Sequence, residues 1–276
     1  MTKKKQHYVA QNYLKRFSVN RRDEQIYVYI RKTGEIKLNA IRDVGQAKYF
    51  YDSEFDEFMP KPGKHALENH FSEFEGVFPQ ILDSLEKGVP LGTDFSKETF
   101  SYFMFLNWIR SKYWRKYLER NKEDFGLSSS GMHFAAMAMP DLRDLFMEKI
   151  KSRIPIRLKT RSEIPFIASD NPVIVSPIPS DVADFVNMTG EDLGELLDRV
   201  SYMLPLSPNT LLYLPSERDI QFKDKTSIST NSDFLTRYVS DLASFSTEQI
   251  YSSVPDGLLN IVGRGMKIFD GKVNDQ

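Results

Sequence analysis

The sequence predicts an α+β fold in which a helical middle, about residues 65–152, packs against antiparallel or mixed β regions from the N- and C-terminal parts. Strand-like alternation comes first along the chain, helical periodicity follows, and strands punctuated by prolines come last. Alternating strand and helix units, the pattern of a parallel sheet with crossover helices, are absent. Because no linker rich in Pro, Gly or Ser divides residues 1–276, we expect a single domain.

The first part of the chain predicts a β-hairpin. Residues 25–30 alternate aromatic and β-branched side chains, as a half-buried strand does. The segment Lys32-Thr33-Gly34-Glu35 suits a turn into a second strand over residues 36–39. The aromatic run Tyr49-Phe50-Tyr51 fits the end of a further strand.

The middle of the chain predicts helices. From His65, apolar residues recur with a heptad-like spacing that indicates one helix of about five turns, and Gly88-Val89-Pro90 ends it. The next pattern predicts one long helix over about residues 97–121, with Asp94 or Ser96 as its N-cap.

The remaining elements follow from breaks and prolines. Residues 132–152 continue the helical pattern, and Pro140 predicts a break within it. Short apolar runs between prolines then predict strands over residues 154–159, 164–168, 173–176, 202–206 and 210–214. Helices are expected within residues 180–199 and 231–242, and a strand or hairpin over 258–269.

Composition excludes several classes of protein. The chain has no cysteine, so disulfides, thiolate metal sites and cysteine nucleophiles are absent. It has no apolar run of the roughly 18 residues that a membrane span needs, and residues 1–22 lack the apolar centre of a signal peptide. We therefore expect a cytoplasmic protein without membrane partners. No common nucleotide-binding, zinc-protease or serine-hydrolase motif is present.

The charges are segregated although the net charge is only −1. Residues 1–22 hold seven Lys or Arg and no acid, residues 110–122 hold six against one acid, and residues 149–161 hold six against none. If these segments lie on one surface that includes Lys3–Lys5 and part of residues 110–122, the positive charge of that surface would suit nucleic acid as a partner. The alternative is that they solvate separate faces.

Two polar residues interrupt an otherwise apolar helix. Asn107 and Arg110 share a face with aromatic residues, and apolar side chains cover most of the remaining surface, so we expect both to be buried. A buried guanidinium needs a partner, either a carboxylate or a bound anion such as phosphate. Glu68 and Glu75, two helical turns apart, could supply that carboxylate, bind a divalent cation or act as acid and base.

Two further candidates lie outside the helices. His7 follows three lysines and is either a packed histidine or a general acid or base, because its pKa lies near neutrality. Asp170 and Asn171 follow an apolar strand and precede a proline, which suits an Asx turn or the presentation of polar groups at a site.

These pieces together resemble a bacterial family, domain of unknown function 4238. The segment His7–Phe17 is similar to the family's opening His-Tyr-Val-Pro-Gln-x-Tyr-Leu-x-x-Phe, with Ala10 in place of its proline. The segment Phe166–Val173, which contains Ser-Asp-Asn-Pro, carries the second likeness. The family often has Thr-Pro where this chain has Ser111-Lys112. The resemblance implies no established activity, but it implies that seven residues match recurring polar positions: His7, Gln11, Glu68, Glu75, Arg110, Asp170 and Asn171.

One functional hypothesis is a phosphodiesterase or nuclease, as in a bacterial defence or toxin effector. Its catalytic residues would be His7, Glu75, Arg110 and Asp170, with Arg110 clamping the phosphate. Gln11, Asn107 and Asn171 would bind substrate, and Glu68 would help to bind Mg²⁺ or Mn²⁺. We expect the four catalytic residues to meet at one cleft, because a shared network would satisfy them all.

The alternative hypothesis is a non-catalytic module that binds nucleic acid or a small anionic ligand. The same polar residues would then form a structural hydrogen-bond network.

Overall fold

The computed structural model describes residues 5–20, 24–52, 66–120, 128–160, 165–176, 190–216, 219, 227–229, 232–256 and 258–259. Strands in these ranges form three sheets. A four-stranded antiparallel sheet has the order β3-β2-β11-β6 and joins β2 (Gln25–Ile30) and β3 (Glu35–Ala40) to β6 (Ala168–Ser169) and β11 (Gln249–Ser252). The two ends of the chain therefore share one sheet, and the predicted hairpin over residues 25–39 is confirmed.

A five-stranded sheet holds only strands from the second half of the chain. Its order is β10-β5-β9-β8-β7, and only the β10–β5 pair is parallel, so the sheet is mixed. Its strands are β5 (Ile156–Lys159), β7 (Ile174–Ser176), β8 (Ser201–Ser207), β9 (Thr210–Leu214) and β10 (Ser227–Ser229). The third sheet pairs β1 (Lys5–His7) with β4 (Gln46–Lys48).

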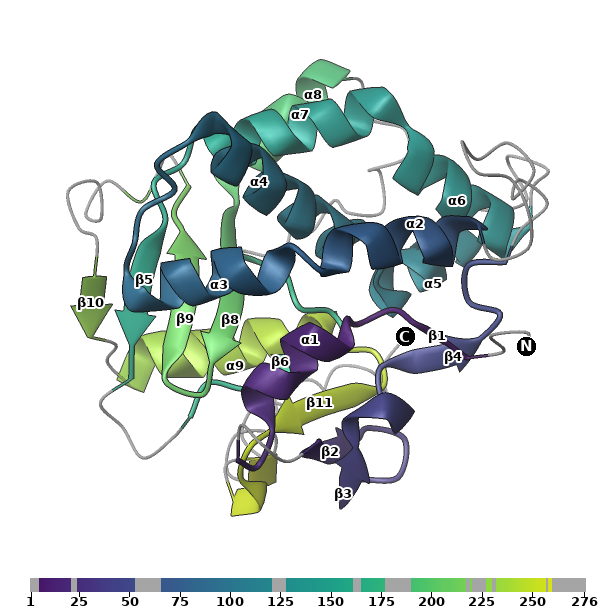
Figure 1. The fold of residues 1–276 in the computed structure, drawn as a ribbon, viewed down its shortest axis with the longest axis vertical. Coiled ribbons are helices and arrows are strands. Elements are labelled where there is room, and N and C mark those ends of the chain that lie inside the picture. Colours follow the sequence, from purple (N-terminus) through teal and green to yellow (C-terminus); the bar gives the residue numbers. More distant parts are fainter. Residues whose placement is uncertain are drawn as a thin grey trace, which may run out of the picture.

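The middle of the chain is helical, as predicted; in Figure 1 its helices lie above the four-stranded sheet, and α3 passes in front of β8 and β9. It comprises α2 (Ala66–Glu75), α3 (Phe78–Lys87), α4 (Asp94–Ile109), α5 (Lys112–Arg120), α6 (Ser129–Ala138) and α7 (Pro140–Lys151). The other helices are α1 (Gln11–Leu14), α8 (Gly190–Arg199) and α9 (Ser232–Phe245), with 3₁₀ turns at Lys15–Phe17 and Ile41–Asp43. The α+β class is thus established, and the break at Pro140 is confirmed. None of the helices in the described ranges is long and apolar enough to cross a bilayer.

Two predicted helices are each divided in the structure. The helix expected from His65 is interrupted at Gly76-Val77 and becomes α2 and α3. The helix expected over residues 97–121 ends at Ile109 and resumes as α5 after Arg110 and Ser111. The Ser111 hydroxyl donates to the carbonyl of Trp108 at 3.0 Å, a local bond that competes with continuation of the helix.

Three smaller predictions need correction. The N-cap of α4 is Thr93, not Asp94 or Ser96, because Thr93 and Ser96 exchange hydrogen bonds in a capping box. The strand expected over residues 164–168 is only Ala168–Ser169, and strand β11 was not predicted. Residues 180–189 and 260–269, parts of two further predicted elements, lie outside the described residues, and residues 258–259, where a strand or hairpin was expected to begin, are helical.

Helix α3 ends on a glycine that the geometry requires. Gly88 has φ +86°, and the Val89 N–H donates to the carbonyl of Ser84 at 2.9 Å, as in a Schellman motif. A Cβ on Gly88 would lie 2.3 Å from Cζ of Arg157. The positive φ therefore disfavours any residue other than glycine here, and an added Cβ would also have to displace the Arg157 guanidinium.

We expect Gly88→Ala to lower the free energy of unfolding by about 1–3 kcal/mol, because alanine disfavours positive φ and must displace Arg157. Urea denaturation measures this loss. The matched control is Gly92→Ala, where a Cβ meets no atom within 4 Å. Equal stability of the two variants would contradict the prediction.

Candidate functional site

Arg110 lies in the kink between α4 and α5 and is 1% exposed. Its Nη2 donates to Oε1 of Glu75 at 2.9 Å and to the carbonyl of His7 at 3.3 Å. Its Nε donates to the carbonyl of Tyr8 at 3.2 Å, and its Cζ lies 5.2 Å from the centre of the Phe71 ring. The expected burial and pairing of Arg110 are confirmed, and a carboxylate of α2 is one of its partners.

The imidazole of His7 lies at the edge of this cluster and is partly buried. Its Nε2 is 3.3 Å from the carbonyl of Arg42, so this nitrogen carries the hydrogen and donates it. Burial lowers the pKa of His7 below its usual value; the Arg42 carbonyl and the charge of Glu75 act in the opposite direction, and the charges of Arg110 and Lys5 add to the lowering. His7 is therefore a neutral imidazole at neutral pH.

Further hydrogen bonds hold the backbone around His7 in place. The Tyr51 hydroxyl also donates to the His7 carbonyl, at 3.2 Å, and the Gln6 Oε1 accepts the Tyr51 N–H at 2.6 Å. Sequence reasoning missed Gln6, which is completely buried. These bonds join the N-terminal motif to Tyr51, and the Arg110 bonds join it to the end of α4 and, through Glu75, to α2.

Asp170 belongs to a different set of contacts. It is completely buried and accepts hydrogen bonds from the N–H groups of Thr247, Glu248 and Gln249 and from the Thr247 hydroxyl, at 2.6–3.2 Å. Burial raises its pKa, while these four donors act to lower it. Asp170 thus fixes the start of β11. Burial raises the pKa of Tyr8, and the charge of Asp170 adds to this effect, but the hydrogen bonds of Asp170 go to residues 247–249.

The contacts therefore bring together three of the four predicted catalytic residues: His7, Glu75 and Arg110. Asp170, which follows β6, instead accepts hydrogen bonds from the segment that enters β11. Only Glu75, 24% exposed, and His7 reach the surface, because the Arg110 guanidinium is covered by protein.

The predicted substrate-binding residues belong to three different segments: Gln11 to α1, Asn107 to α4, and Asn171 to the turn after β6. Asn107 is buried, and its Nδ2 donates to the carbonyl of Phe103 at 2.9 Å, whereas its Oδ1 has no hydrogen-bond partner among the described residues. Asn171 is also buried, and neither atom of its amide has a partner in the described chain. Gln11 is partly exposed at the start of α1.

The side chain of Glu68, the predicted metal ligand, lies outside the described part of the structure. The backbone of Glu68 belongs to α2, but its side chain and the whole of His65 lie outside the described residues. Within the described part of the chain, no three His, Asp or Glu side chains gather in a way that would hold a metal ion.

The basic segments are largely engaged with protein. Lys149 pairs with Asp198 at 2.5 Å, Lys151 pairs with Glu98, and Arg153 donates to the carbonyls of Leu197 and Val200. Arg110, the first residue of the basic segment 110–122, is buried, as expected, and so does not contribute to a basic surface. Residues 1–4 and 161 lie outside the described residues, so binding of nucleic acid stays a prediction.

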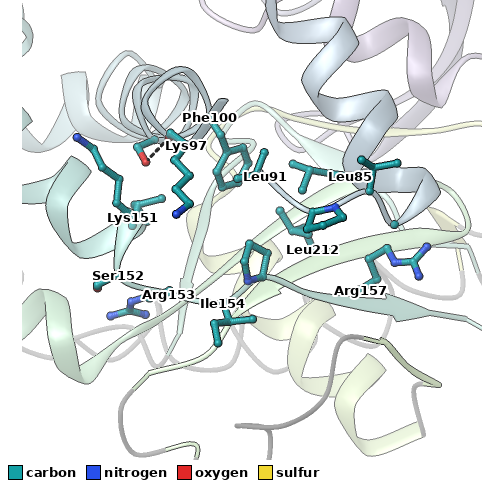
Figure 2. A pocket seen from close by; sticks show the side chains of 16 residues that line it. Leu85, Leu91, Lys97, Phe100, Lys151, Ser152, Arg153, Ile154, Arg157 and Leu212 are labelled. Atoms are coloured by element: carbon teal, nitrogen blue, oxygen red, sulfur yellow. Dashed lines mark hydrogen bonds between the residues drawn. The ribbon is translucent and has the colours of Figure 1, made fainter. Parts of the chain in front are cut away.

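A cavity that sequence reasoning missed lies between the end of α3, the start of α4, the end of α7 and strand β5 (Figure 2). Its volume is about 390 Å³, within the range of small-molecule sites, roughly 300–1,000 Å³. Among the described lining residues every charged one is a cation: Lys97, Lys151, Arg153 and Arg157. The one sequence signal that points to this cavity is the run of basic residues over 149–161, which contains Lys151, Arg153 and Arg157.

Lys97 differs from the other three cations. In Figure 2 its ammonium points into the cavity. No described residue forms a hydrogen bond or ion pair with its side chain, whereas Lys151 pairs with Glu98 and Arg157 donates to the carbonyl of Glu86 at 3.3 Å. Lys97 is thus a cation whose charge is available to a ligand.

Fold and sites define an α+β protein whose N-terminal motif is tied to a helical layer by a buried arginine, with a cation-lined cavity on the same layer. The chain belongs to the family described as "Protein of unknown function (DUF4238)", whose model matches residues 5–255. No curated protein and no solved structure matches the chain. The likeness based on the two sequence motifs is therefore confirmed.

Proposed function

We propose that the protein is a non-catalytic module that binds a small organic anion in the cavity between α3, α4, α7 and β5. The observation that carries the proposal is the charge of that cavity. The described charged residues lining it are all cations, and Lys97, whose ammonium pairs with none of the described residues, points inward. An anion there gains attraction without displacing a protein carboxylate from Lys97. Arg153 and Arg157 add positive potential although their donors contact backbone carbonyls.

The geometry of Arg110 favours binding over phosphodiester hydrolysis. A clamp on a scissile phosphate needs guanidinium donors aimed at the substrate. The donors of Arg110 contact Glu75 and the carbonyls of His7 and Tyr8, and its side chain is 1% exposed. These contacts fit the structural network of the non-catalytic alternative.

Calorimetric titration of the full chain with benzoate, a small anion with an apolar ring, tests the proposal. We expect saturable binding, weakened about tenfold or more in Lys97→Gln. The attraction between unit charges 4 Å apart is about 1 kcal/mol in water and about 4 kcal/mol near a protein surface, and 1.4 kcal/mol corresponds to a factor of ten.

The matched control is Lys48→Gln, which removes an exposed lysine of β4, outside the cavity lining. It should bind benzoate as the unaltered chain does. Absence of saturable binding, or equal binding by the two variants, would contradict the proposed function.

A further inference from the structure

We infer that the ligand of this cavity is a single-chain amphiphile, with an anionic head beside Lys97 and an aliphatic chain along the apolar wall. The inference rests on the proposed function and adds the chemical class of the ligand. It starts from the distribution of polar and apolar groups around the cavity.

The wall of the cavity is mostly apolar and rigidly packed. Leu85, Phe100, Ile150 and Leu212, each no more than 4% exposed, line it from α3, α4, α7 and β9. Such a wall offers dispersion contacts and no hydrogen bonds, so it favours a hydrocarbon group over a second polar group.

Polar and apolar lining residues are segregated. In Figure 2, Lys97, Lys151, Ser152 and Arg153 lie on one side of the cavity, and Leu85, Leu91 and Leu212 lie on the other. Arg157 stands on the apolar side, but its guanidinium is turned away toward the end of α3, where it donates to the Glu86 carbonyl. A ligand that fills the cavity therefore meets cations at one end and hydrocarbon at the other.

Two lining residues extend the apolar surface to the solvent. Val89 is 53% exposed and Ile154 is 62% exposed, and both line the cavity. An aliphatic chain lying against them would remove their surface from water, which is favourable in proportion to the area covered. A compact inorganic anion beside Lys97 would leave both exposed.

The size of the cavity restricts the ligand to one short chain. A volume of about 390 Å³ lies near the lower limit for small-molecule sites. Free amphiphile and membrane lipid share the required chemistry, and this volume favours a free single-chain carboxylate over a lipid with two chains.

Calorimetry of the full chain with octanoate, acetate and 1-octanol tests the inference. We expect octanoate to bind at least about tenfold more tightly than acetate, because added methylene groups leave water. Octanol, which lacks the charge, should bind more weakly than octanoate. Ile154→Ser should weaken octanoate binding about threefold and leave acetate binding unchanged, whereas Val19→Ser, at an exposed position outside the lining, should change neither.

The outcomes separate this inference from the proposed function. If acetate binds as tightly as octanoate while benzoate binding still depends on Lys97, the inference that the ligand has an aliphatic chain is wrong. The proposed function stands in that case. Octanol matching octanoate, together with benzoate binding that Lys97→Gln does not alter, would overturn both. If the protein cosediments with phosphatidylglycerol vesicles and Ile154→Ser abolishes this binding, the ligand is a membrane lipid and the inference of a free amphiphile is wrong.

Discussion

Replacing Arg110 with alanine should lower the free energy of unfolding by about 3–5 kcal/mol, the cost of removing one partner from a buried ion pair. The substitution leaves the Glu75 carboxylate and the carbonyls of His7 and Tyr8 without their guanidinium donors. Because Glu75 is 24% exposed, water can solvate part of its charge, so the lower end of this range is expected. Urea denaturation at neutral pH measures the loss.

His7→Ala is the companion variant, since it keeps the backbone carbonyl that Arg110 contacts. Among the described residues the His7 imidazole makes one hydrogen bond, at 3.3 Å to the Arg42 carbonyl, so the loss should be no more than about 1 kcal/mol. Arg110→Lys retains the charge without the forked donors and should fall between the two. The opposite result would be an Arg110→Ala protein that is as stable as the unaltered chain but has lost a phosphodiesterase activity which the unaltered chain shows. That result would favour the catalytic hypothesis.

The parts of the fold that the sequence predicted well carry local signals. The hairpin of β2 and β3 follows from alternation on either side of Gly34, which has φ +71° in the turn. Pro140 stands at the first position of α7, where its missing N–H costs nothing. Strand β9 has the predicted bounds, 210–214, because Pro208 precedes it and Pro215 follows it.

The parts that the sequence did not predict depend on distant contacts. The kink at Arg110 is set by carbonyls of residues 7 and 8, about a hundred positions earlier, which no periodicity encodes. Strand β11 is short and becomes a strand by pairing with β2 and β6, with Asp170 capping its start. The cavity could not be predicted for the same reason, because its apolar wall combines residues of four elements that are spread along the chain. A single buried charge, by contrast, is visible in the sequence, because Arg110 stands in an aromatic helix.

His133 is a buried titratable group for which the sequence suggested no role. It is 1% exposed, and its Nε2 lies 2.7 Å from the carbonyl of Ile109, the last residue of α4, to which it donates. Its Nδ1 is buried with no partner among the described residues. Burial, together with the charge of Arg115, lowers the pKa of His133 to about 4, although the bond to Ile109 acts in the opposite direction. Protonation would add a buried N–H donor with nothing to accept it.

We therefore expect His133 to make the protein less stable as the pH falls below neutrality. Between the unfolded pKa of 6.5 and the folded pKa of about 4, the unfolded chain binds the extra proton, so stability falls with decreasing pH across this window and is constant above it. From pH 7 to pH 5 this group alone should cost about 2 kcal/mol. His133→Gln keeps a donor for the Ile109 carbonyl but does not titrate, so its free energy of unfolding should decline by about 2 kcal/mol less over the same interval. Urea denaturation of both proteins at pH 5, 6 and 7 compares the slopes, whatever the absolute stability of the variant. Parallel slopes would show that His133 is not buried in its neutral form.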